Sequence, residues 1–160
     1  MSEEQPDLSK IEMLESAPHF SYLTFDDKSE LVDHMELLRF LPGDVVIHEG
    51  EEIETVYFIF DGSVDVMKAS VDGERVVLAT LGKGEIVGES AIYTGVSNAT
   101  VLIRAAENTC ALALSKGAFS EIRDNNPRLA FNLVFDMMKL LRRRLNDVSN
   151  RLADHLTSEG

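Results

Sequence analysis

Glycine is concentrated in one stretch of this chain, and that concentration restricts the possible folds more than any other feature of the sequence. Eight of the ten glycines fall between Gly43 and Gly95, where they separate short runs rich in Val, Ile and Phe. These runs cover residues 45–47, 56–60, 64–67, 76–81, 100–103 and 110–114. Short runs of this kind with turn residues between them are typical of an antiparallel barrel or sandwich. We therefore expect residues 37–115 to form an antiparallel β-structure.

Two Asp-Gly pairs in this stretch have the chemistry of tight turns. They are Asp61-Gly62 and Asp72-Gly73, and each lies between two predicted strands. A tight primed turn needs residues that tolerate positive φ, which Asp and Gly do. We expect each pair to close a β-hairpin.

The segment before the β-structure, residues 1–36, has no glycine and places its apolar residues at helical spacing. Thr24 and Asp27 have the spacing of a capping box, with Asp in place of the usual Glu, and they predict where a helix begins. The apolar positions of the two short helices expected here are Ile11 and Leu14, followed by Leu31, Val32 and Met35. The fold class is therefore α+β, mainly β, with N-terminal helices.

The segment after the β-structure, residues 116–160, is also helical in pattern. A short helix is expected from Gly117 to Asp124, and Asn126-Pro127 marks a boundary, with proline at a favourable first helical position. Residues 128–156 contain neither Gly nor Pro. At 1.5 Å per residue that helix is roughly 40 Å long, more than one small domain covers. We treat all three segments as one domain, as the length of 160 residues indicates.

The apolar residues of the long helix indicate what covers it. Their steps alternate between three and four residues, which is the pattern of a two-stranded coiled-coil seam, at Val134, Met137, Leu141, Leu145, Val148 and Leu152. A second apolar face, expected to pack on the β-structure, contains Leu129, Leu133, Phe135 and Leu140. We expect a homodimer formed through residues 128–156. The alternative is a helix that is packed entirely within its own chain.

The net charge and the cysteine content limit which partners the chain can bind and in which cellular compartment it is expected. The net charge of −13 opposes binding to phosphate backbones, so we expect no nucleic-acid partner. No apolar run reaches about 18 residues, so no membrane span is expected. Residues 1–10 lack the layout of a signal peptide, and the single cysteine, Cys110, excludes an internal disulfide. These features predict a cytoplasmic protein.

Catalytic and metal-binding patterns are absent from the sequence. The four histidines are scattered, and no pair of them has the spacing of a zinc site. No nucleophile, base and acid can be grouped from sequence alone. We expect neither an enzyme, nor a bound metal, nor a cofactor.

The stretch that carries binding chemistry is residues 81–101. It contains Gly82, Gly84 and Gly88, and Glu89 follows the third glycine directly. Glycines let a backbone approach a ligand closely, and consecutive free amides bind anions. A carboxylate beside such amides suits a ligand that has both a phosphate and hydroxyl groups. The alternative is a tight loop between two strands.

Three segments of the chain form a recognisable pattern: residues 41–50 (LPGDVVIHEG), 56–64 (VYFIFDGSV) and 81–92 (LGKGEIVGESAI). In this order they resemble the cyclic-nucleotide-binding domains of bacterial catabolite activators and of protein kinase A regulatory subunits. The resemblance runs from about Phe20 to Leu156. It implies a jelly-roll-like antiparallel β-roll with a long C-terminal dimerisation helix, and a phosphate-binding cassette within residues 82–101.

The resemblance also implies roles for single residues. Gly88 begins the cassette, Glu89 accepts a hydrogen bond from the ribose 2′-hydroxyl, and the amide of Ala91 meets the cyclic phosphate. Ile86 and Val87 line the wall near the sugar and base. The full set of expected ligand-binding residues is Ile86, Val87, Gly88, Glu89, Ser90, Ala91, Ser97, Asn98, Ala99 and Arg144.

One position departs from the family pattern. The family's cassette ends with an arginine that pairs with the phosphate, whereas this chain has Ser97 when aligned from Thr100, or Asn98 when aligned from Glu89. Losing a charge-assisted hydrogen bond weakens binding roughly ten- to a hundred-fold. Either neutral donors replace the arginine, or one of the arginines at 142–144, of which Arg144 is the candidate, supplies the charge, or the pocket binds nothing.

The expected function follows from these features. The chain is predicted to be a regulatory module that senses a cyclic nucleotide (cyclic AMP or cyclic GMP) or a similar ligand. Binding would move a hinge near residues 116–127 and reposition the long helix. Catabolite activators continue into a DNA-binding domain, but this sequence ends at Gly160, so the signal is expected to pass to a partner protein. The alternative is a ligand-free scaffold that dimerises through the long helix.

Overall fold

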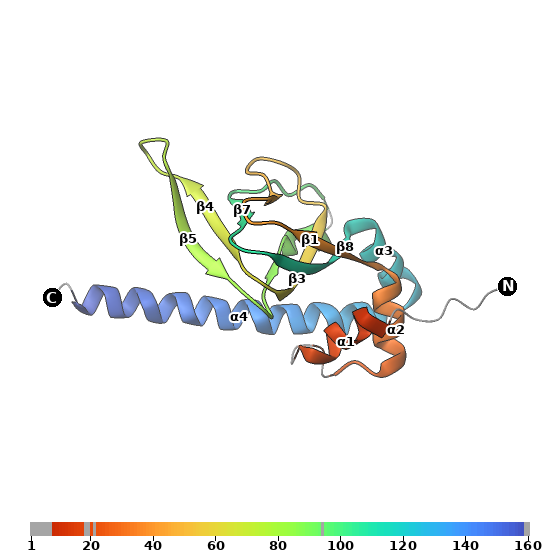
Figure 1. Ribbon diagram of the computed structural model, residues 1–160. Helices are drawn as coiled ribbons and strands as arrows, with labels where there is room; N and C mark the ends of the chain where they lie inside the picture. Colours follow the sequence, from red (N-terminus) through yellow and green to blue (C-terminus); the bar gives the residue numbers. More distant parts are fainter. Residues whose placement is uncertain (1–7, 18–19, 21, 94, 159–160) are drawn as a thin grey trace.

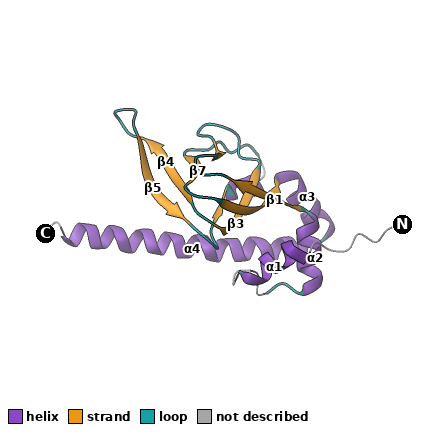
Figure 2. Ribbon diagram, viewed as in Figure 1, coloured by secondary structure: helices purple, strands orange, loops and turns teal. Residues whose placement is uncertain are grey.

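Two antiparallel sheets form the centre of the computed structural model, which describes residues 8–17, 20, 22–93 and 95–158. One sheet has the strand order β1-β8-β3-β6 and the other β2-β7-β4-β5, and every paired neighbour is antiparallel (Figures 1 and 2). The strands are β1 (Met35–Phe40), β2 (Val45–Ile47), β3 (Thr55–Asp61), β4 (Val64–Ala69), β5 (Arg75–Leu81), β6 (Ile86–Val87), β7 (Leu102–Ala105) and β8 (Thr109–Ser115). The predicted antiparallel β-roll is confirmed.

The first strand is the largest difference from the pattern of the sequence. Met35 was expected on a helix, but α2 ends at Asp33 and Met35 begins β1. Residues Met35–Phe40 pair along their whole length with β8. Pairing with a buried strand therefore outweighs the helical spacing of the apolar residues, as tertiary context commonly does.

The two Asp-Gly turns have different outcomes. Gly73 has φ of +81° and connects β4 to β5, which pair with each other, so this predicted hairpin is confirmed. The hairpin expected at Asp61-Gly62 is wrong, because β3 and β4 belong to different sheets. Gly62 does adopt φ of +83°, and a Cβ there would lie 2.2 Å from the carbonyl oxygen of Asn108. Turn chemistry fixes the backbone angle, but not which strands pair.

In the described residues, four α-helices lie along one side and at one end of the sheets (Figure 1): α1 (Leu8–Ser16), α2 (Phe25–Asp33), α3 (Lys116–Asn125) and α4 (Pro127–Ser158). The predicted capping box is present, since the Thr24 hydroxyl accepts from the Asp27 amide at 3.1 Å and the Thr24 amide donates to the Asp27 carboxylate at 3.2 Å. The predicted start of the long helix at Pro127 is also confirmed. Apolar residues of α1, α2 and the first half of α4 join β3 and β8 in one core cluster.

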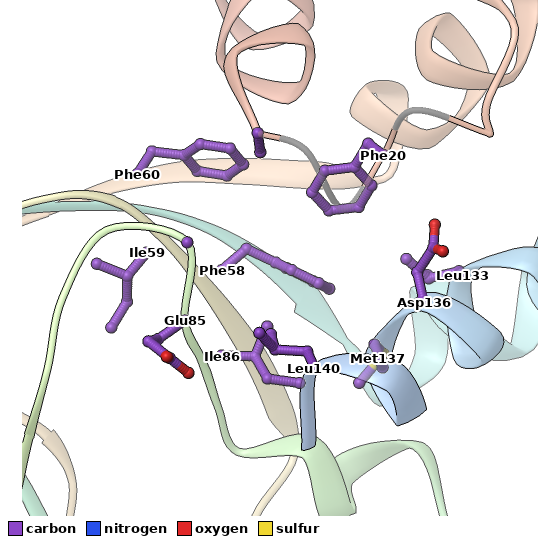
Figure 3. Close-up of a pocket in the computed structure, with 12 residues that line it drawn as sticks. Phe20, Phe58, Ile59, Phe60, Glu85, Ile86, Leu133, Asp136, Met137 and Leu140 are labelled. Atoms are coloured by element: carbon purple, nitrogen blue, oxygen red, sulfur yellow. The ribbon is translucent and has the colours of Figure 1, made fainter. Parts of the chain in front are cut away.

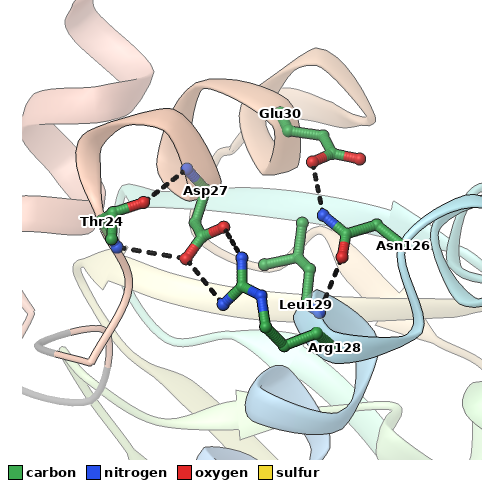
Figure 4. A network of polar contacts seen from close by, with 6 residues as sticks. All are labelled: Thr24, Asp27, Glu30, Asn126, Arg128 and Leu129. Carbon is green, nitrogen blue, oxygen red and sulfur yellow. Dashed lines mark hydrogen bonds and ion pairs between the residues drawn. The ribbon is translucent and has the colours of Figure 1, made fainter.

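Polar contacts fix the first turn of α4 to α2 (Figure 4). The Arg128 guanidinium donates to both oxygens of the buried Asp27 carboxylate, at 2.5 and 3.3 Å. Asn126 donates to Glu30 at 2.8 Å, and its side-chain oxygen accepts from the amide of Leu129 at 3.2 Å. Arg128 holds the pKa of Asp27 below its usual range by this hydrogen bonding. The start of α4 is therefore held by two independent side-chain links.

The long helix α4 is packed along only half of its length. It has 32 residues and is about 48 Å long, and its C-terminal end projects past the β-roll (Figure 1). The first half is buried through Leu129, Ala130, Leu133, Asp136, Met137 and Leu140. The predicted long C-terminal helix is therefore confirmed.

The predicted seam needs a correction in its first half. Met137 was assigned to a partner helix, but it is only 4% exposed and belongs to the chain's own core. Phe135 was assigned to the β-structure, but it is exposed and stacks on Phe131 with ring centroids 6.0 Å apart. The exposed apolar residues of α4, here called the outer seam, are Phe131, Phe135, Met138, Leu145, Val148, Leu152 and Leu156.

Candidate functional site

The cassette begins at a backbone position that only glycine fits. Gly88 has φ of +74°, and a Cβ there would lie 2.3 Å from the carbonyl oxygen of Thr55. Gly88 turns the chain from β6 into the 3-10 helix η2 (Glu89–Ile92). The carboxylate-bearing residue that follows, Glu89, is thereby placed at the edge of a cavity.

The opposite side of this cavity is a loop fixed by backbone hydrogen bonds. The carbonyl of Ser97 accepts from the amide of Ile53 at 2.8 Å. The amide of Ala99 donates to the carbonyl of Glu51 at 2.8 Å, and its carbonyl accepts from Gly50 at 2.7 Å. Residues 97–99 are therefore held against residues 50–53 without the use of their side chains.

The cavity between these segments has a volume of about 360 Å³, within the range of small-molecule pockets. Most of the predicted site residues lie around it: Val87, Gly88, Glu89, Ser90, Ser97, Asn98, Ala99 and Arg144. The sequence analysis missed the rest of the lining, which is mainly the apolar wall supplied by the strands: Ile47, Ile53, Val66, Leu81, Thr100, Val101 and Ile103. The inward alternation of β2, β4 and β7 is the signal that points to three of these side chains, Ile47, Val66 and Ile103.

Two predicted residues lie outside this lining. Ile86 faces α4 instead, where it packs near Met137 and Leu140 around a second, almost filled cavity of about 10 Å³ (Figure 3). Ala91 is fully buried, and its amide donates to the carbonyl of Gly88 at 3.0 Å. The structure therefore places Ile86 between cassette and helix, and it gives the Ala91 amide a partner within the cassette.

Arg144 connects the cavity to α4. Its guanidinium donates to Glu85 at 2.8 Å and to the carbonyl of Ile86 at 2.6 Å. Both charged side chains of this ion pair are 24% exposed. Arg142 and Arg143 are exposed on the helix surface, so of the three consecutive arginines only Arg144 lines the cavity.

The charge around the cavity is unevenly distributed. Arg144 is the only cationic side chain among the described lining residues, and it is paired with Glu85. The Glu89 side chain makes no hydrogen bond or ion pair with any other described residue. Ser97 and Asn98 are neutral donors and acceptors. The cavity thus offers one carboxylate without a partner, neutral polar groups and an apolar wall.

Neither a metal centre nor a membrane span is found in the part of the chain that the structure describes. Its His, Cys, Asp and Glu side chains form no group of three or more that could hold a metal ion. Its helices include none that is both long enough and apolar enough to cross a bilayer.

Comparison with known proteins gives consistent matches in sequence. A family model described as "Cyclic nucleotide-binding domain" matches residues 37–126. The cAMP-activated global transcriptional regulator CRP of Pasteurella multocida is 27% identical over 120 residues, covering 74% of this chain and 57% of the regulator. A cAMP-dependent protein kinase regulatory subunit of Hypocrea atroviridis is 34% identical over 109 residues, covering 68% of this chain and 22% of the subunit. The chain thus spans just over half the length of the bacterial regulator.

The fold also matches solved structures. A cyclic nucleotide-binding domain from Methylobacillus flagellatus superimposes with a TM-score of 0.79 at 20% identity, over 92% of this chain and 83% of that one. At this identity the likeness concerns the fold alone.

Proposed function

This chain belongs to the cyclic nucleotide-binding domain family, and we propose on that basis that it is a regulatory module that senses a nucleotide-like ligand. The single observation that carries the proposal is the cavity of about 360 Å³ between the cassette and residues 97–99. Its apolar wall suits a base, and Glu89 suits the hydroxyls of a ribose. The names of the relatives, a cAMP-activated regulator and a cAMP-dependent kinase subunit, support a ligand of the cyclic nucleotide class.

The output of such a module would pass through α4. Arg144 joins the helix to Glu85, and Ile86 packs against Met137 and Leu140, so both contacts reach the helix from the residues just before the cassette. A ligand that binds one position of α4 more tightly than another shifts the helix toward that position. The chain would thereby convert occupancy of the cavity into a change at α4 that a partner protein reads.

A second copy of the chain is the proposed occupant of the outer seam of α4. Leu145, Val148 and Leu152 repeat at steps of three and four residues on the projecting half of the helix. The edge strand β5 also exposes apolar side chains, at Val76, Val77 and Leu78. Since a monomer leaves both surfaces in water, a homodimer through α4 accounts for them together.

Titration calorimetry on the whole chain tests the sensing function. We expect saturable binding of at least one ligand among cyclic AMP, cyclic GMP, cyclic di-GMP and the nucleosides adenosine and guanosine. Glu89→Ala should abolish or strongly weaken that binding. Glu74→Ala removes an equally charged side chain from the β4–β5 turn, outside the cavity, and should leave binding unchanged. A folded chain that binds none of the five ligands contradicts the sensing function and favours the ligand-free, dimerising scaffold.

A further inference from the structure

We propose that the cavity binds an uncharged nucleoside more tightly than it binds the corresponding cyclic nucleotide. This inference rests on the proposed function, because it concerns the ligand of the same cavity. Three features of the lining support it. The cation Arg144 is already paired with Glu85, the amide of Ala91 already donates to Gly88, and the Glu89 carboxylate has no partner among the described residues.

The cation of the lining is already used. Arg144 directs its guanidinium at Glu85 and at the carbonyl of Ile86, with distances of 2.8 and 2.6 Å from the same nitrogen. A phosphate in the cavity would have to compete with a carboxylate that is fixed beside the guanidinium. Because Glu85 neutralises Arg144, the described lining has no net positive charge with which to attract an anion.

The neutral donors of the cavity would stabilise a bound phosphate only weakly. The amide of Ala91 donates within the cassette, to the carbonyl of Gly88 at 3.0 Å. Ser97 and Asn98 carry no charge, and a hydrogen bond from a neutral donor is weaker than one from a cation. Taking an ionised phosphate out of water without a paired charge is costly. The contacts that these neutral donors offer are therefore too weak to offset the cost of desolvating a phosphate.

The Glu89 carboxylate discriminates in the same direction. It lines the cavity and has no partner among the described residues. An ionised carboxylate accepts hydrogen bonds and donates none. A nucleoside offers it three ribose hydroxyls, whereas a 3′,5′-cyclic nucleotide has closed two of those oxygens into its phosphate ring and keeps only the 2′-hydroxyl. The carboxylate also repels the phosphate, so both effects favour the nucleoside.

Calorimetry on the whole chain with adenosine, guanosine, cyclic AMP and cyclic GMP tests this preference. We expect the better nucleoside to bind at least ten-fold more tightly than its own cyclic nucleotide. Glu89→Gln removes the negative charge, so it should weaken nucleoside binding and reduce the ratio of nucleoside affinity to cyclic nucleotide affinity. Ser97→Arg should strengthen cyclic nucleotide binding at least ten-fold and leave nucleoside binding nearly unchanged. Val71→Arg adds the same charge in the exposed β4–β5 turn and should change neither.

The outcomes separate this inference from the proposed function. A cyclic nucleotide that binds the native chain as tightly as its nucleoside, or more tightly, overturns the preference and leaves the sensing function standing. A native chain that is folded by circular dichroism and binds none of the four ligands, nor cyclic di-GMP, overturns the sensing function itself. An unchanged ratio in a folded Glu89→Gln variant removes Glu89 as the source of the discrimination and overturns the argument built on it.

Discussion

The two halves of α4 belong to one continuous helix but do different work. Residues 127–141 bury one apolar face in the core, where Leu133 is 0% exposed, and leave Phe131, Phe135 and Met138 exposed on another face. Residues 142–158 leave all of their large apolar side chains in water, where Leu145 is 65% and Leu152 is 57% exposed. Arg144 lies just past the junction and contacts the residues that precede the cassette. The first half therefore stabilises the fold, and the second half is available to a partner.

The difference between the two halves indicates where a displacement of this helix can begin. A helix without an internal Gly or Pro has no built-in kink, so a shift at the junction carries through to its free end. The projecting half needs no contact with the cavity for this to happen. Variants on either side of the junction should accordingly affect different properties of the protein.

Leucine truncation on the two sides should give the clearest contrast. Leu133→Ala leaves a cavity in the core, so we expect the free energy of unfolding to fall by about 2–5 kcal/mol. Leu152→Ala removes an exposed side chain, so at concentrations where the chain is monomeric the change should stay within about 0.5 kcal/mol. Urea denaturation measures both. Equal losses at the two sites would mean that the halves are not functionally distinct.

Charges on the outer seam should break association without unfolding the chain. In the variant that combines Leu145→Asp with Leu152→Asp, each dimer buries carboxylates without partners, so we expect the dimer dissociation constant to rise at least a hundred-fold, or about 2.7 kcal/mol. Light scattering across a concentration series measures it. Asn146→Asp with Asn150→Asp adds the same charge away from the outer seam and should have little effect. A dimer that survives the first variant must use another surface.

The junction itself should respond to Arg144→Gln. This change removes the ion pair with Glu85, whose two side chains are each 24% exposed, and we expect a loss of about 1 kcal/mol. Hydrogen exchange should become faster in residues 141–148, with little change near Leu133. Arg143→Gln, on the exposed surface of the same turn, is the matched control. Unchanged exchange in the Arg144 variant would show that the junction is held by apolar packing alone.

The ion pair between Arg128, in the first turn of α4, and Asp27 should make the stability of the fold depend on pH. Arg128 holds the pKa of Asp27 below its usual range, so the ionised carboxylate stabilises the folded state. That contribution is complete above the unfolded-state pKa of about 4 and is lost as the pH falls through the lower folded-state value. Asp27→Asn should lower the Tm by roughly 2–4 °C near neutral pH and by less in acid. A deficit that does not change with pH would exclude the ion pair as its cause.

The features that local sequence determines were predictable. Thr24 and Asp27 cap a helix because the capping contacts span only three residues, and Pro127 starts one because its missing amide costs nothing there. Gly88 was recognisable because only glycine tolerates its φ and its closeness to Thr55. Gly88 and Glu89 of the predicted cassette accordingly lie at the edge of the cavity.

The features that depend on distant partners were not predictable. Met35 joins a strand because β8 is available beside it, and Met137 faces inward because Phe58 and Ile86 lie there. Strand pairing and helix rotation are set by residues far along the chain. The pairing of Arg144 with Glu85, 59 residues earlier, is likewise visible only in three dimensions.

The backbone bonds that fix residues 97–99 to residues 50–53 have a consequence for how this protein changes over generations. Because main-chain atoms hold the loop, the side chains at 97 and 98 can be replaced without rebuilding its path. Asn98 is exposed and Ser97 is partly so, which leaves room for larger groups. A substitution at either position can then change the charge of the cavity lining while the backbone path stays intact. The charge of the cavity lining and the stability of the fold can thus change nearly independently of each other.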